Sequence, residues 1–154
     1  MFTVKAKRIR HMTLSAQGLS GPSKVKVGLP KGAADGEIIK IGVWNHFGTK
    51  GGASGGGWGG PIPERPFLTN AMRNNRSNYR SAMRSAAKAV LLGSTNMKSV
   101  VTKLGIMGQG DVQKEITALR SPPNSPVTIA LKGSDNPLID TGRLRASITY
   151  KVDD

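Results

Sequence analysis

The chain has 154 residues, no cysteine and a formal net charge of +14. Its length fits a single domain, 1–154, and the lack of cysteine excludes disulfides, cysteine-based zinc sites and thiol catalysis. The positive charge indicates attraction to polyanions but says nothing about the fold. With 37% hydrophobic residues, 20 Gly and 9 Pro, the composition favours a modest core and long loops. Such a core would be helped by burial against other subunits.

No apolar run approaches the roughly 18 residues that a membrane-spanning helix requires. The N-terminus is basic, but no apolar signal core follows it, so neither a membrane span nor secretion is expected.

Residues 1–34 form a basic N-terminal region with seven Lys or Arg and no acidic residue. Apolar and polar residues alternate in Met1–Arg10 and again in Lys24–Leu29, which predicts two strands of a small antiparallel sheet. The cations of the first stretch are candidates for contact with DNA or an acidic partner: Lys5, Lys7, Arg8 and Arg10.

The stretch Asp35–Phe47 fits two structures. Its isoleucines alternate with polar residues as in a strand, yet Asp35 can cap a helix and Gly48 can end one, and we favour a short helix. Residues 49–61 are rich in glycine and are predicted to form a flexible loop. Because the loop lacks the Gly-Lys-Ser/Thr ending of a phosphate-binding loop, nucleotide binding is not expected. Trp58 in this loop either docks on its own subunit or anchors a neighbouring one.

Residues 62–93 are predicted to contain one long helix of about 40 Å, with Pro66 in its first turn and Gly93 after its end. One apolar face is expected to pack on the sheet: Leu68, Met72, Tyr79, Met83 and Val90. A second face, the cation stripe, carries Arg73, Arg76, Arg80, Arg84 and Lys88. The stripe is either a solvated face or a contact surface for an acidic protein or a nucleic-acid backbone.

Two shorter helices are predicted after the long one. Ser94 can cap the first, which runs through Leu104 until the glycines of 105–110 interrupt it. Asp111 can cap the second, which places apolar residues up to Leu119 on one side.

Residues 121–154 are predicted to form a C-terminal connector and strand. Prolines exclude a helix in 121–126, and Val127–Leu131 suits a short extended segment. Asp140–Gly142 resembles a capped turn that leads into one or two helical turns, and Ser147–Val152 alternates as a final strand. The whole pattern predicts an α+β fold in which a small antiparallel sheet packs against one long helix and two shorter helices, with long flexible loops.

Residues suited to catalysis are sparse. The two histidines, His11 and His46, lack the spacing of a metal site, and no G-x-S-x-G motif marks a nucleophile. Asp140 beside Thr141 is better explained by turn capping than by acid–base chemistry. We therefore expect no enzyme activity, no cofactor and no metal.

Three segments in order carry a resemblance: WNHFGT at 44–49, IPERPFL at 62–68, and PPNSP followed by PLIDTGRLR between 122 and 145. Together they resemble tail-completion and neck proteins of tailed bacteriophages, including the lambdoid tail-component family and the virion-morphogenesis proteins of contractile-tailed phages. The resemblance covers about residues 35–152. Its motif residues here are Phe47, Gly48, Thr49, Pro63, Arg65, Pro66, Phe67, Pro137, Leu138, Asp140, Thr141, Gly142 and Leu144.

The resemblance implies a structural α+β subunit that forms a homo-oligomeric, hexameric ring at the head-proximal end of the tail. It implies other neck, connector, tail-terminator or tail-tube proteins as partners, a place in the virion, and assembly in the bacterial host cytoplasm. The alternative, from charge alone, is a non-specific nucleic-acid-binding protein. If the cation stripe faces the DNA channel or an acidic partner, charge reversal of Arg76, Arg80 and Arg84 is expected to block assembly without unfolding the subunit.

Overall fold

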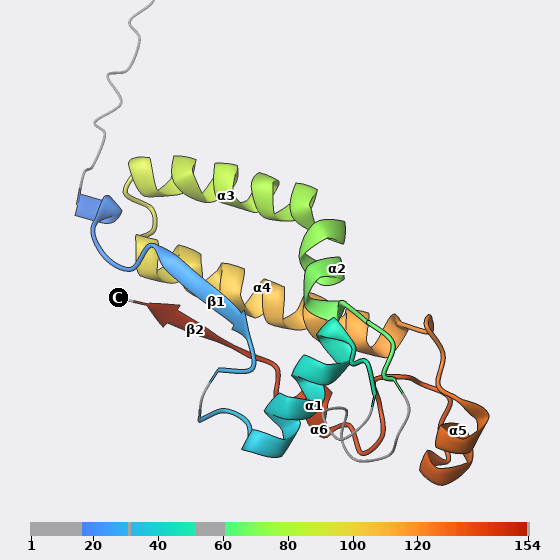
Figure 1. Ribbon diagram of the computed structural model, residues 1–154. Coiled ribbons are helices and arrows are strands. Elements are labelled where there is room, and N and C mark those ends of the chain that lie inside the picture. Colours follow the sequence, from blue (N-terminus) through green and yellow to red (C-terminus); the bar gives the residue numbers. More distant parts are fainter. Residues whose placement is uncertain (1–16, 31, 52–60, 154) are drawn as a thin grey trace, which may run out of the picture.

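The computed structural model describes residues 17–30, 32–51 and 61–153 (Figure 1). The strand expected at Met1–Arg10, with its cations Lys5, Lys7, Arg8 and Arg10, lies outside these residues, as does Trp58. Within them the predicted α+β class is confirmed: a two-stranded antiparallel sheet is combined with α-helices. In this part of the chain no helix is both long and apolar enough to cross a membrane.

The sheet joins the two ends of the described chain. Strand β1, Lys24–Gly28, pairs with strand β2, Thr149–Asp153, so that Val25 lies opposite Val152 and Val27 lies opposite Tyr150. These side chains share one face because successive residues of a strand point to opposite sides. Both strands were predicted from the alternation of apolar and polar residues.

Helix α4, Met97–Ala118, covers this apolar face and is the longest helix of the described residues. It is a single helix, so the predicted interruption at residues 105–110 is wrong. A Cβ on Gly105 would lie 2.4 Å from Tyr150 Cδ2, and one on Gly108 would lie 3.0 Å from Val27 Cγ2. Because neither glycine has a side chain, the helix can lie close against the sheet at both positions. The helix is capped by Asn96, whose side chain accepts from Ser99 N at 2.9 Å, and not by Ser94.

The long helix predicted for residues 62–93 is divided in two, so that prediction is wrong. Helix α2 spans Phe67–Asn74 and helix α3 spans Arg76–Leu91, and the chain turns sharply between them (Figure 1). Asn75 lies at the turn, and both its backbone N–H and its side chain donate to the Ala71 carbonyl. Asparagine favours such breaks because its side chain competes for backbone hydrogen bonds.

The prediction that the apolar side of this region packs on the sheet is also wrong. Helices α2 and α3 pack against α4, which itself covers the sheet. Met83, expected at the sheet, is 47% exposed. The glycine-lined side of α4 fits closer to the strands than a helix bearing methionine and tyrosine, so α4 takes that position.

The short helices follow their capping residues. Helix α1, Gly36–Phe47, starts at Asp35, whose side chain accepts from Ile38 N at 2.8 Å, and ends at Gly48, which confirms the helix favoured for this stretch. Helix α5, Pro126–Lys132, replaces the extended segment expected there. Ser125 caps it and proline is favoured in a first turn, which outweighs the β-branched residues that follow.

Helix α6, Arg143–Ala146, confirms the predicted helical turn. The core lies where α1, α2, α4 and α6 meet. Its fully buried side chains include Phe67, Ile116 and Ile148. A 3-10 turn, Gln17–Leu19, packs near the end of α3.

Candidate functional site

The three motif segments meet around one buried side chain, Arg65, which is 3% exposed. Its Nη1 donates to Asn45 Oδ1 at 3.0 Å, and its Nε donates to the Pro122 carbonyl at 2.8 Å. Its Nη2 donates to the Pro123 carbonyl at 3.0 Å and to Asn124 Oδ1 at 3.3 Å. We call these five residues the Arg65 cluster.

The guanidinium of Arg65 is held by neutral oxygens. No carboxylate among the described residues bonds to it, and its partners are carbonyl and amide groups alone. Burial lowers the pKa of Arg65, but an arginine remains protonated at neutral pH. A buried charge is tolerated only when its donors are bonded. The planar fork of donors thus fixes three segments in one geometry.

Asn136 continues the network from the connector to α4 and α5. Its carbonyl accepts from Asn124 Nδ2 at 3.3 Å and from Lys132 Nζ at 3.0 Å. Its side chain donates to the Thr117 carbonyl at 3.0 Å and accepts from Leu138 N at 3.0 Å. Hydrogen bonds of Asn136 therefore tie the two ends of segment 121–136 to each other and to α4.

A cavity of about 810 Å³ opens beside the Arg65 cluster. Its lining combines apolar side chains of α1, such as Ile38 and Ile41, with the charged Lys132 and Asp140. Burial lowers the pKa of Lys132, the Asp140 carboxylate opposes this shift, and the Arg65 cation adds to it. Most motif residues line this cavity: Pro63, Arg65, Pro137, Leu138, Asp140, Thr141, Gly142 and Leu144.

The remaining motif residues lie in the chain segments next to Asn45 and Arg65. Thr49 N donates to the Ile62 carbonyl at 2.8 Å, and Ile62 N donates to Thr49 Oγ1 at 3.1 Å. Gly48 has a φ of 71°, and a Cβ there would lie 2.9 Å from the Ile62 carbonyl. Pro66 precedes α2, in which Phe67 is completely buried, whereas Phe47 is 71% exposed. Pro66 thus lies just before the helix and not within its first turn.

His46 packs among aromatic rings. It meets Phe47 and Phe67 edge to face, with ring centroids 4.6 and 5.3 Å away. Its Nε2 lies 3.4 Å from Thr69 Oγ1, and its Nδ1 has no partner among the described residues. Burial lowers the pKa of His46, with Glu64 opposing the shift. No three His, Cys, Asp or Glu residues in the described ranges are placed to hold a metal ion.

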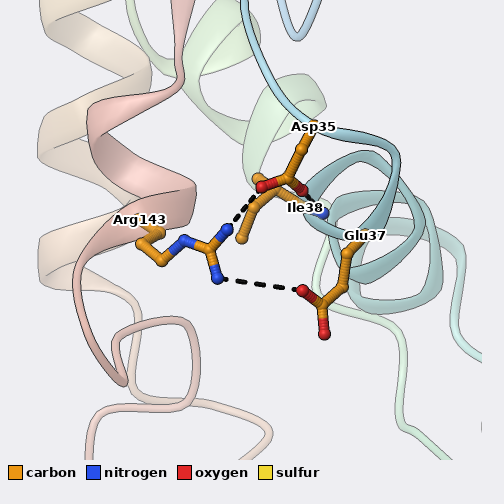
Figure 2. Close-up of polar contacts among 4 residues, drawn as sticks. All are labelled: Asp35, Glu37, Ile38 and Arg143. Atoms are coloured by element: carbon orange, nitrogen blue, oxygen red, sulfur yellow. Dashed lines mark hydrogen bonds and ion pairs between the residues drawn. The ribbon is translucent and has the colours of Figure 1, made fainter.

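Asp35 and Arg143 connect the start of α1 to α6 (Figure 2). One Asp35 oxygen accepts from Ile38 N at 2.8 Å, and the other accepts from the Arg143 guanidinium. The backbone bond from Ile38 is the main cause of the lowered Asp35 pKa, and the nearby Arg143 cation adds to it. Glu37 lies 3.8 Å from the same guanidinium, so both carboxylates hold the arginine at the cavity rim.

The structure divides the cation stripe. Arg73 lies on α2, whereas Arg76, Arg80, Arg84 and Lys88 lie on α3, and all five are exposed. Across residues 17–30, 32–51 and 61–153, no carboxylate pairs with any of them. The opposite side of α3 packs on α4 and is fixed there by Tyr79, whose hydroxyl donates to Asp111 Oδ2 at 2.7 Å. Burial and this bond raise the Tyr79 pKa.

Four residues of these sites were not recognised as functional from the sequence: Asn45, Asn124, Asn136 and Arg143. Asn45, Asn124 and Arg143 stand inside the motif segments, so their polar character in those segments was the available signal. Asn136 carried none. No family model, curated protein or solved structure matches this chain. Its function is therefore inferred from the Arg65 cluster, the adjoining cavity and the exposed side of α3.

Proposed function

We propose that the chain is a structural subunit of the neck or tail end of a tailed bacteriophage and assembles with copies of itself into a ring around the DNA channel. The Arg65 cluster carries the proposal. Arg65, in the second of the three segments whose order resembles the tail-completion and neck proteins, bonds to both of the others. A guanidinium that donates four hydrogen bonds to neutral acceptors rigidifies the chain, which suits a subunit that must present fixed surfaces to its neighbours.

Exposed apolar side chains beside the cluster support self-association. Leu131 and Val127 on α5 are 84% and 69% exposed, and Phe47 at the end of α1 is 71% exposed. Val127 and Leu131 are four residues apart on one side of α5, and neighbouring exposed apolar side chains of this kind mark contact surfaces. A ring requires two different surfaces on every copy, and the proposal assigns them to α5 and to the end of α1. Sixfold symmetry, the other neck and tail proteins as partners, and the virion location come with the resemblance.

Mass photometry of the purified chain over a concentration series tests the proposal. We expect a single closed ring to replace the monomer as concentration rises. The double substitution Val127→Ser and Leu131→Ser should shift the population back to monomer. The matched pair Leu92→Ser and Ile106→Ser, exposed just after α3 and on α4, should not. A chain that stays monomeric at all concentrations and binds DNA would instead favour the alternative function, non-specific nucleic-acid binding.

A further inference from the structure

Helix α3 is open along most of its length. It packs against α4 through one side, where Val90 is buried and Tyr79 bonds to Asp111, and the turn Gln17–Leu19 packs beside its C-terminal part. In Figure 1 it runs along the outer edge of the protein. Most of its remaining side chains are exposed. The helix thus presents a broad surface that no described element covers.

Apart from Met83 and Ala87, the exposed side chains of α3 all carry hydrogen-bond donors. Arg76, Arg80, Arg84 and Lys88 recur every fourth residue, a rise of about 6 Å from one to the next. A row of exposed serines, Ser77, Ser81 and Ser85, runs beside them. We call these seven residues the α3 face. No Asp or Glu occurs between residues 65 and 110 of the sequence, so no carboxylate close in sequence neutralises the positive charge of the face.

The chemistry of the α3 face fits phosphate better than it fits protein or bases. Arginine, lysine and serine are among the side chains that donate hydrogen bonds to phosphate oxygens. Protein interfaces centre on aromatic and other apolar anchors, and single-strand binders stack bases on aromatic rings. The aromatic residues of α2 and α3 are withheld from the face, since Phe67 is buried and Tyr79 is bonded to Asp111. We infer that the α3 face binds the phosphate backbone of duplex nucleic acid without reading its sequence.

This inference is independent of the proposed ring, because a monomer displays the same face. The test is fluorescence anisotropy of the full chain with a mixed-sequence DNA duplex at several salt concentrations. The variant neutralises three cations of the face, Arg76→Gln, Arg80→Gln and Arg84→Gln. Its control removes equal charge from exposed positions on α1, α4 and β2, Lys40→Gln, Lys114→Gln and Lys151→Gln. Arginine, lysine and glutamine have similar helix propensities and all six altered side chains are exposed, so both variants should fold.

Each phosphate contact contributes about −0.9 to the slope of log affinity against log salt. We expect the slope of the α3 variant to be shallower by roughly 2.7, because three contacts are removed. Between about 50 and 200 mM salt, the variant should therefore lose roughly 40-fold less affinity than the unaltered chain. The control should keep the slope of the unaltered chain. Equal changes in both variants would overturn the inference, because net charge alone would then explain binding. The inference would also be overturned if the unaltered chain failed to bind duplex DNA or preferred single strands. It would be overturned as well if the α3 variant lost binding to polyglutamate but kept its binding to DNA.

Discussion

Arg65 and Asn45 are joined twice. The backbone N–H of Arg65 donates to the Asn45 carbonyl at 2.7 Å, and Arg65 Nη1 donates to Asn45 Oδ1 at 3.0 Å. The end of α1 is thereby fixed to the segment before α2 by direct bonds. The same guanidinium reaches the connector at Pro122 and Pro123. Local geometry at the cavity therefore depends on one side chain.

The substitution Arg65→Lys tests this dependence. A lysine keeps the charge but lacks the planar fork, so several of the oxygens now bonded to Arg65 would lose their donor. We expect the free energy of unfolding to fall by about 2–4 kcal/mol in urea titrations. Arg73→Lys, an exposed position on α2, is the matched control and should change stability by less than about 0.5 kcal/mol. Equal effects at the two positions would contradict the role given to Arg65.

The bond between Tyr79 and Asp111 should hold α3 on α4. A double-mutant cycle of Tyr79→Phe and Asp111→Ala isolates it, because a hydrogen bond to an ionised partner contributes about 1.5–3 kcal/mol. We expect a coupling energy of about 1–3 kcal/mol in denaturant unfolding. Additive effects of the two substitutions would show that α3 is held by its apolar contacts instead.

Two glycines of α4 should respond oppositely to alanine. A Cβ at Gly105 would lie 2.4 Å from Tyr150 Cδ2, so Gly105→Ala should destabilise the protein by about 1–3 kcal/mol. Gly110 has nothing within 4 Å of such an atom. There the better helix propensity of alanine should raise stability by about 0.4–1 kcal/mol. Thermal unfolding of both variants measures the contrast, and a stable Gly105→Ala protein would argue against close packing of α4 on the sheet.

His46 should make stability depend on pH. Burial lowers its pKa in the folded protein, so the unfolded chain binds a proton first as pH falls. The neutral ring is compatible with folding above about pH 6.5, the ordinary value, and stability is lost as pH drops from there through the folded pKa. We expect His46→Gln to remove this component, so that its unfolding free energy changes less between pH 7.5 and 5 than that of the unaltered chain. Identical pH profiles would mean that protonation of the ring does not oppose folding.

Much of the local structure was predictable, because its causes are local in sequence. Asp35 and Gly48 mark the ends of α1, and alternation of apolar and polar residues marks both strands. The continuity of α4 was not predictable in this way. The need for glycine at 105 comes from Tyr150, which is distant in sequence, so the same residue resembled a helix terminator.

The candidate site was predictable only as separate pieces. The three segments were visible in the sequence, but their meeting point depends on bonds from Arg65 to the carbonyls of Pro122 and Pro123. Backbone carbonyls occur at every residue, so no side-chain pattern identifies those that serve as partners. The cation stripe was visible as a pattern, but the turn at Asn75 that assigns Arg73 to a different helix was not.

A cryo-EM map tests the proposal that the chain is a ring-forming neck or tail subunit most directly. The sample is the phage particle produced from the genome that encodes this chain. We predict a closed ring of its copies at the head-proximal end of the tail, with α5 of one subunit against the end of α1 of the next. A complete, infectious particle whose map accounts for every neck and tail density without this chain would contradict the proposal.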